Sequence, residues 1–151
     1  MRTIDGIEDL KALAGKELGV SLYKTIDQAS IDAFADATGD HQFIHVDPER
    51  AKTTPFGGTI AHGLLTLSLG PVFLGEIWEL TGVAFAVNYG YGKVRFPSPV
   101  PVDSKLRMRA TVAEVSDVAG GVQAQITQTF ELEGGAKPAC VAEALIRVYG
   151  S

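Results

Sequence analysis

The chain has 151 residues, of which 46% are hydrophobic and 21% charged, the size and balance of one globular domain over residues 1–151. A formal net charge of −5 without a Lys/Arg cluster excludes a basic nucleic-acid surface and disfavours an anionic membrane, while one cysteine excludes an internal disulfide. Acidic residues from Asp5 onward and the lack of an apolar run predict no signal peptide. The helical part of the uncharged segment over residues 53–75 is shorter than the roughly 20 apolar residues of a membrane span, so we expect a cytoplasmic location.

Two helices and a strand are predicted in the first 40 residues. Apolar residues recur at helical spacing over residues 7–14, and residues 18–22 alternate as a short strand. A second helix begins after Asp27, a suitable N-cap, and ends at Gly39, because glycine tolerates the left-handed conformation of a helix end. Asp40 then stands at the mouth of a polar loop.

The most apolar element is a long helix predicted over residues 60–80. It follows a short helix over residues 47–51, with Asp47 as N-cap and Pro48 at its first position, and a loop over residues 53–59. Its apolar residues cover much of the circumference, so we expect it to be buried on more than one side. Pro71 predicts a bend inside it.

The second half of the chain predicts four strands. Residues 83–96 are β-rich, residues 106–112 and 122–132 alternate between apolar and polar, and residues 140–149 are apolar enough to form an interior strand. In the first of these strands the odd positions are expected to share one face, which would carry Tyr89, Tyr91, Lys93 and Arg95. An antiparallel sheet must cover one face, and only the long helix is large enough to do so. The predicted fold class is therefore α+β, with an antiparallel sheet wrapped around a central helix.

All three histidines, His41, His45 and His62, fall between residues 34 and 69, beside the most apolar helix. Asp40 and His45 are five residues apart on one loop, close enough to converge on one water. A carboxylate and an imidazole can exchange protons near neutral pH. A metal site formed by His41, His45 and Asp40 is disfavoured because their spacing lies on an irregular loop, so we expect no metal and place His41 in solvent.

The sequence ATGDHQFIH at residues 37–45, followed by Asp47-Pro48, IAHG at 60–63 and RFPSPV at 95–100, resembles the MaoC-like hydratase family. These are (R)-specific enoyl-CoA hydratases and related dehydratases with a hot-dog fold. The family pattern is roughly Gly-Asp-x-Asn-Pro-aliphatic-His, with a His-Gly pair at the start of the central helix. The resemblance extends from about residue 26 onward. The chain departs from the pattern at Gln42-Phe43, in place of Asn-Pro, and at Asp103, in place of a glycine.

The resemblance implies reversible hydration of trans-2-enoyl-CoA to (R)-3-hydroxyacyl-CoA by a homodimer without a cofactor. Asp40 and His45 would hold the water, and which of them removes its proton stays open. The backbone N–H of Gly63, in the first turn of the buried helix, would donate to the thioester oxygen. The expected substrate-binding residues are Gln42, His62, Asn88 and Tyr89.

Two alternatives remain at this point. The same fold serves acyl-carrier-protein dehydratases and thioesterases; a thioesterase releases free thiol from crotonyl-CoA, whereas a hydratase removes the enoyl absorbance without releasing it. The second alternative is an acyl-thioester-binding protein or partner subunit without hydratase activity. The replacement of Asn-Pro by Gln42-Phe43 keeps that alternative open.

Overall fold

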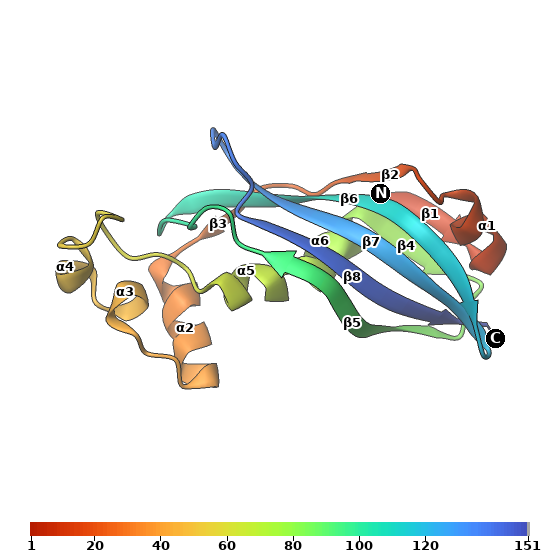
Figure 1. The fold of residues 1–151 in the computed structure, drawn as a ribbon, viewed down its shortest axis with the longest axis horizontal. Coiled ribbons are helices and arrows are strands. Elements are labelled where there is room, and N and C mark those ends of the chain that lie inside the picture. The colour runs from red at the N-terminus through yellow and green to blue at the C-terminus, as the bar shows by residue number, and fades with distance from the viewer. Residues whose placement is uncertain (151) are drawn as a thin grey trace.

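An antiparallel sheet curls around two consecutive helices in the computed structural model, which describes residues 1–150 (Figure 1). The sheet order is β2-β6-β7-β8-β5, and β3 also pairs with β6. The strands are β1 (Arg2–Asp5), β2 (Glu17–Val20), β3 (Lys24–Ile26), β4 (Trp78–Thr81), β5 (Phe85–Arg95), β6 (Ser104–Val118), β7 (Gly121–Leu132) and β8 (Cys140–Tyr149). The helices are α1 (Gly6–Ala12), α2 (Gln28–Thr38), α3 (Phe43–Val46), α4 (Pro48–Ala51), α5 (Gly63–Ser68) and α6 (Gly70–Ile77). This arrangement confirms the predicted α+β class.

The central helix is shorter and more broken than predicted. Ile60 forms a β-bridge with Pro101, so the helical part begins only at Gly63. The expected bend becomes a break between α5 and α6, beside Pro71, whose ring nitrogen cannot donate a hydrogen bond. The helix also ends early, because Trp78 is extended (φ −133°, ψ 157°) and β4 pairs in parallel with β1 at the N-terminus.

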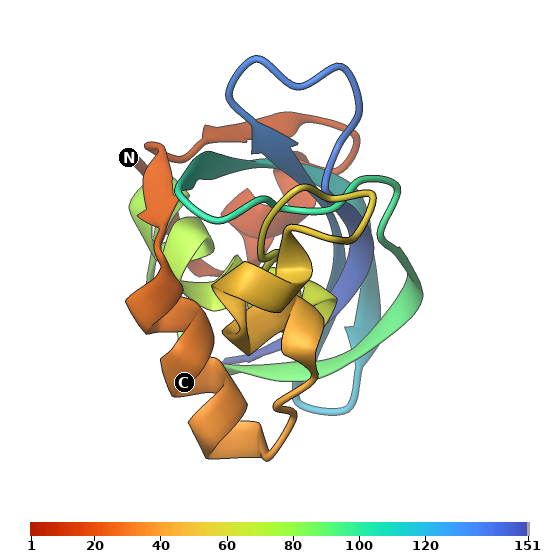
Figure 2. The ribbon, with the colours of Figure 1, turned by 90° about the vertical axis from the view of Figure 1, so that its left-hand side faces the viewer.

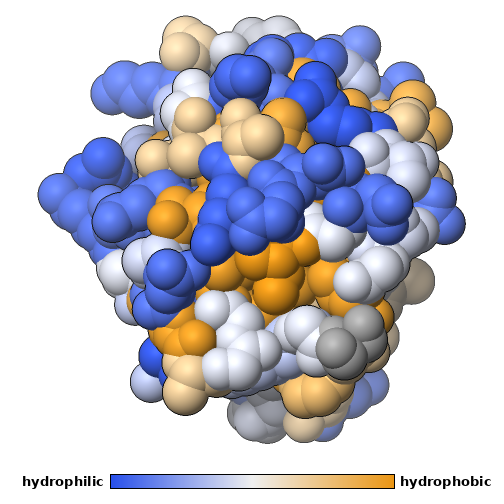
Figure 3. All heavy atoms as spheres, turned by 90° about the vertical axis from the view of Figure 1, so that its right-hand side faces the viewer, coloured by the Kyte–Doolittle hydropathy of each residue, from blue (hydrophilic) through white to orange (hydrophobic). Residues whose placement is uncertain are grey.

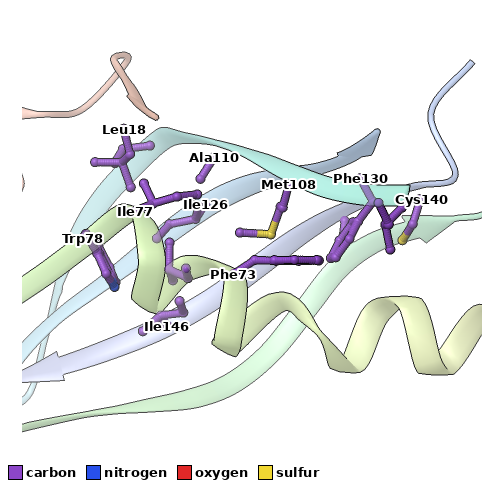
Figure 4. Close-up of a cluster of buried hydrophobic side chains, with 14 of the residues drawn as sticks. Leu18, Phe73, Ile77, Trp78, Met108, Ala110, Ile126, Phe130, Cys140 and Ile146 are labelled. Carbon is purple, nitrogen blue, oxygen red and sulfur yellow. The ribbon is translucent and has the colours of Figure 1, made fainter. Parts of the chain in front are cut away.

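The core lies between α6 and the concave face of β6, β7 and β8 (Figure 4). Phe73 and Ile77 on α6 face the sheet, where Met108, Ile126 and Phe130 alternate with half-exposed polar neighbours. Burying each such side chain contributes about 1.5–3 kcal/mol, before the entropy of ordering it is subtracted. β8 lies between β7 and β5, which confirms the interior position expected for the last strand.

β5 is an edge strand, and its faces depart from the sequence prediction. It pairs with β8 alone and forms an edge of the sheet, although β6 follows it along the chain. Its register shifts between Asn88 and Gly90 and again between Tyr91 and Val94. Each β-bulge reverses the alternation of faces. The predicted common face of odd positions is therefore wrong: Tyr91 pairs with the inward-facing Ala144, whereas Tyr89 contacts the outward-facing Arg147.

The two ends of the sheet differ. Helices α2, α3 and α4 gather at one end and lie in front of the sheet in Figure 2. The opposite end carries α1 and the turn between β6 and β7, and shows apolar atoms in the middle of a largely hydrophilic surface (Figure 3). Within residues 1–150, no helix has the length and apolar character needed to cross a membrane.

Candidate active site

Asp40 is presented by the C-terminal end of α2. Asp27 caps the start of this helix by accepting a hydrogen bond from the N–H of Ser30 (2.9 Å), and Gly39 ends it in the left-handed conformation (φ 83°). Both features confirm the sequence prediction. Asp40 is exposed, and its Oδ1 accepts a hydrogen bond from the N–H of Gln42 (3.3 Å). The carboxylate is therefore fixed at the start of the loop that leads to α3.

His45 lies on α3, a short helix where the sequence predicts a loop. Its Nδ1 is 2.7 Å from the carbonyl oxygen of Ile60, and because a carbonyl only accepts, Nδ1 carries the proton. The lone pair is therefore on Nε2. Gln28 on α2 donates from Nε2 to the carbonyl of His45 (2.7 Å) and accepts at Oε1 from the hydroxyl of Thr59. One α2 side chain thus connects the backbone of α3 to the hydroxyl of Thr59, in the segment before α5.

His62 stacks on His45 and connects the loop to the central helix. The two ring centroids are 3.8 Å apart with an interplanar angle of 22°, and the ring of Phe34 also contacts His62 (4.8 Å). Nε2 of His62 is 2.9 Å from the carbonyl oxygen of Asp40, so this nitrogen donates. Nδ1 of the same ring is buried and has no partner among the described residues.

Gly63 opens α5 directly after His62. N–H groups in the first turn of a helix have no intrahelical acceptor, so they are available to a ligand. A Cβ at this position would lie 3.1 Å from ring carbons of Phe96, a tight contact that the ring would have to move to relieve. The absence of a side chain at Gly63 therefore lets Phe96 pack against the helix start and keeps the backbone N–H open.

Two pockets meet at His45 and Gly63, which line both. The larger pocket has a volume of about 320 Å³ and is completed by Phe56, Ile60, Ala61, Thr66, Phe96, Ser98, Pro99, Val100 and Ala139. The smaller pocket has a volume of about 150 Å³ and is completed by Phe34, Thr38, Asp40, His62 and Leu64. A molecule that spans both pockets meets the imidazole of His45 and the backbone of Gly63, with the carboxylate of Asp40 to one side.

The cluster suits proton transfer better than metal binding. Asp40, His45 and His62 offer ligand atoms within 4.8 Å of one another. The stacked rings of His45 and His62 lie in nearly parallel planes, and each nitrogen lone pair lies in the plane of its own ring. A metal ion needs lone pairs that converge on one point, which such rings do not provide. His41, also considered as a ligand, bonds to Asp36 (2.9 Å) with 53% of its side chain exposed, as expected. This bond, above other causes, raises the pKa of His41.

The structure does not gather all the predicted substrate-binding residues. Gln42 contacts Asp40 through its backbone N–H, and its side chain lines neither site pocket. Asn88 lines a separate cavity of about 220 Å³ beside α6. Tyr89 is 57% exposed on the outer face, with the guanidinium of Arg147 3.5 Å from its ring centroid. Within one chain, only His62 of this group lies at the site.

The departure from the family pattern at Gln42-Phe43 is accommodated by α3. Gln42 is the N-cap of this helix and Phe43 is its first residue, the position at which proline is favoured in helices. Phe43 instead packs its ring under the guanidinium of Arg50 on α4 (3.9 Å). The loop therefore remains anchored without the proline, and His45 follows two residues after Phe43 on the same helix.

Other residues of the site carry no local sequence signal. Gln28 is 17 residues from the carbonyl that it binds, and Thr66 and Phe96 line the larger pocket from elements far apart in the sequence. Only the helical spacing of Thr66 from Gly63, three residues, indicates that the two share a face of α5.

The outer face of the sheet carries a larger hollow, of about 360 Å³, remote from the histidines. Arg109 donates to Glu17 (2.7 Å) and to Glu131 (3.1 Å), and Arg107 donates to Glu131 (2.9 Å). The bonds to Glu17 and then to Glu131 raise the pKa of Arg109. Because these charges already neutralise one another, the hollow offers no evident chemistry.

Comparison with protein families agrees with this geometry. A model of the family described as "MaoC like domain" matches residues 9–133. The chain is 53% identical over 148 residues to 3-hydroxyacyl-thioester dehydratase Z of Mycobacterium tuberculosis, which covers 97% of this chain and 98% of the relative. It is 44% identical to nodulation protein N of Rhizobium meliloti, over 90% of this chain and 86% of the relative.

The fold is also that of a solved hydratase. The (R)-hydratase of A. caviae, involved in PHA biosynthesis, superposes with a TM-score of 0.72 at 27% identity, covering 88% of this chain and 94% of that one. Together with the sequence relatives, this likeness confirms the hot-dog architecture of a sheet around a central helix.

Proposed function

The chain belongs to the MaoC-like family of hot-dog dehydratases, and on that premise we propose that it catalyses the reversible (R)-specific hydration of trans-2-enoyl-CoA to (R)-3-hydroxyacyl-CoA. The names of its relatives support a hydratase or dehydratase of thioesters. One observation carries the finer proposal: His45 and Gly63 line both site pockets, and Asp40 lines the smaller one beside them. A thioester across this boundary meets a base, a carboxylate and a backbone donor together.

His45 is the proton carrier in this proposal. Its lone pair on Nε2 accepts a proton from a water that the carboxylate of Asp40 orients through the second O–H. The water oxygen bonds to C3 of the enoyl group, and the electron pair of the double bond moves toward the thioester carbonyl. Nε2 of His45 then returns its proton to C2. The proton count balances, because one hydrogen of water ends on C2 and the other on the new hydroxyl.

The backbone N–H of Gly63 stabilises the enolate oxygen that forms between these two steps. It belongs to the first turn of α5 and needs no side-chain rearrangement to donate. Removing one such donor typically costs about 10²–10³ in kcat. His62 keeps the loop in place by donating to the carbonyl of Asp40 and stacking on His45.

The working enzyme in this proposal is a homodimer. β5 is an edge strand, and both it and the central helices carry exposed large apolar side chains. The exposed residues are Phe85, Val87, Tyr89, Tyr91, Leu64 and Val72. An unpaired edge rich in apolar side chains invites pairing with a second copy. Gel filtration with light scattering is expected to give twice the 16.0 kDa of one chain.

The test of the catalytic proposal is the loss of enoyl absorbance of crotonyl-CoA, with free thiol measured in the same sample. The wild type is expected to remove the absorbance without releasing thiol and to yield the (R)-3-hydroxy product. Asp40→Asn is expected to lower kcat/KM by about 10²-fold or more, while Asp36→Asn, which alters the exposed partner of His41, serves as control.

Thiol release would instead identify a thioesterase. Turnover of enoyl-acyl-carrier protein alone would identify a carrier-protein dehydratase. Tight binding of acyl-CoA without turnover would favour the partner-subunit alternative.

A further inference from the structure

Thr66 is a buried polar residue of α5 that lines the larger site pocket, and only 2% of it is exposed. Two other buried hydroxyls have partners within the protein. The hydroxyl of Ser21 donates to the next carbonyl along the chain (3.0 Å), and that of Thr59 donates to Gln28. The hydroxyl of Thr66 bonds to no group within residues 1–150. A buried hydroxyl without a protein partner calls for a ligand or a water.

The oxygen of Thr66 is reachable from the pocket. Ser68, two residues further along α5, donates its hydroxyl to the carbonyl of Leu65 (2.7 Å), a common bond of hydroxyls inside helices, but Thr66 does not form the equivalent bond. Among the described residues, the sealed side-chain atoms without a partner are Nδ1 of His62 and Oε1 of Gln128. The oxygen of Thr66 is not one of them, so its hydroxyl is open to a molecule in the larger pocket.

This hydroxyl belongs to the same helix face as the N–H of Gly63. Thr66 follows Gly63 by three residues, which makes the two neighbours about 5–6 Å apart on the helix surface. Helical side chains lean toward the N-terminus, so that of Thr66 extends over the first turn, where Gly63 has no side chain to block it. Both residues line the larger pocket together with His45. A ligand oxygen at the start of α5 therefore has two hydrogen-bond donors within reach.

We propose that the hydroxyl of Thr66 is a second donor to the thioester oxygen and shares with the N–H of Gly63 the stabilisation of the enolate. This inference rests on the proposed function and adds a catalytic side chain to it. The hydroxyl keeps its proton throughout, because it only donates a hydrogen bond to the oxygen on which charge accumulates. Most of the other residues that line this pocket are apolar, so little water competes for the thioester oxygen and both bonds are strengthened.

The first experiment measures kcat and KM for crotonyl-CoA in the wild type, Thr66→Val and Thr66→Ser. Valine has the shape of threonine without the hydroxyl, and serine keeps the hydroxyl. We expect Thr66→Val to lower kcat by about 10²-fold with KM nearly unchanged, because the bond strengthens as charge develops. Thr66→Ser should recover most of the loss. Thr127→Val, the same substitution at a half-buried, outward-facing position of β7, is the control and should leave both constants unchanged.

An infrared measurement detects the same bond without turnover. Butyryl-CoA labelled with ¹³C at its thioester carbonyl has no double bond to hydrate. Its carbonyl stretch is expected to shift to lower wavenumber on binding to the wild type, to shift less on binding to Thr66→Val, and to shift fully again with Thr66→Ser. If valine prevents folding, Thr66→Ala is compared with Thr66→Ser, because both lack the methyl group and they differ in the hydroxyl.

The two measurements together decide. A lower kcat and a smaller carbonyl shift in Thr66→Val, both restored by serine, support the second donor. A carbonyl shift that stays at the wild-type value in Thr66→Val overturns it, whatever happens to kcat, and leaves the hydratase proposal standing. A wild type that does not hydrate crotonyl-CoA overturns the hydratase proposal, and with it this inference.

Discussion

The concave face of the sheet and the end formed by α2–α5 bury their side chains in opposite ways. Between α6 and β6–β8 the buried side chains are almost all apolar, with Gln128 as the exception. At the other end, the buried residues include His45, His62, Thr59 and Thr66. The first region gains stability from burial, whereas the second holds polar groups that water cannot reach. Substitutions in the first region should therefore lower stability, and substitutions in the second should lower activity.

The largest expected effect is on activity. His45→Gln retains an amide N–H that can donate to the carbonyl of Ile60 but has no group that accepts a proton in this pH range. We expect kcat/KM for crotonyl-CoA to fall by about 10³-fold, roughly 4 kcal/mol of barrier, with little change in melting temperature. A loss of activity that simply follows unfolding would contradict this separation of activity from stability.

In the core, the expected effect is on stability. Phe130→Ala removes a fully buried ring that lies 6.2 Å, centroid to centroid, from that of Phe73. The free energy of unfolding is expected to fall by about 3–5 kcal/mol in urea denaturation, while the folded variant keeps its KM for crotonyl-CoA. Leu22→Ala is the control, because Leu22 is 77% exposed and lies outside the proposed dimer edge, and should cost far less. Equal costs for the two substitutions would refute the assignment of the core.

A pH effect should come from Cys140, which pairs across the sheet with Phe130. Burial raises the pKa of this thiol from 9.0 to about 11. The folded protein favours the protonated thiol, so this contribution to the free energy of unfolding is complete below pH 9 and is lost as the pH rises through 11. The loss is at most roughly 2–3 kcal/mol. Denaturation midpoints of the wild type should therefore fall more steeply between pH 9 and 11 than those of Cys140→Ala; parallel curves would count against a buried thiol.

The smallest effect concerns a turn between the two regions. Asp103 has φ 67° and is the one non-glycine residue with positive φ in residues 1–150. Glycine adopts this conformation without steric cost, so Asp103→Gly is expected to stabilise the protein by about 0.5 kcal/mol, and Asp103→Ala to destabilise it. Thermal unfolding of both variants measures the difference. A stabilised alanine variant would be inconsistent with strain at this turn.

The sequence predicts the core better than the site. Alternation along β6 and β7 identifies their buried faces, the apolar composition of β8 indicates its interior position, and the caps Asp27 and Gly39 identify the limits of α2. Periodicity fails where a local exception intervenes. The bulges in β5 move Tyr91 to the inner face, and the pairing of β4 with the N-terminus converts Trp78 from helix to strand.

At the site, the motif predicts which residues meet but not how they are held. Asp40, His45 and Gly63 all line the smaller pocket. The proton position on His45 depends on the carbonyl of Ile60, 15 residues away, and no local pattern encodes that bond. The contribution of Gln28 likewise arises only when α2 packs against α3.

The central claim is that Asp40 and His45 act on one water as a unit. The most direct measurement is a double-mutant cycle with Asp40→Asn and His45→Gln, reading kcat/KM for crotonyl-CoA hydration at one pH. The account predicts strong non-additivity, with the double variant little slower than the more damaged single variant. Losses that multiply, as they do for independent sites, would contradict it.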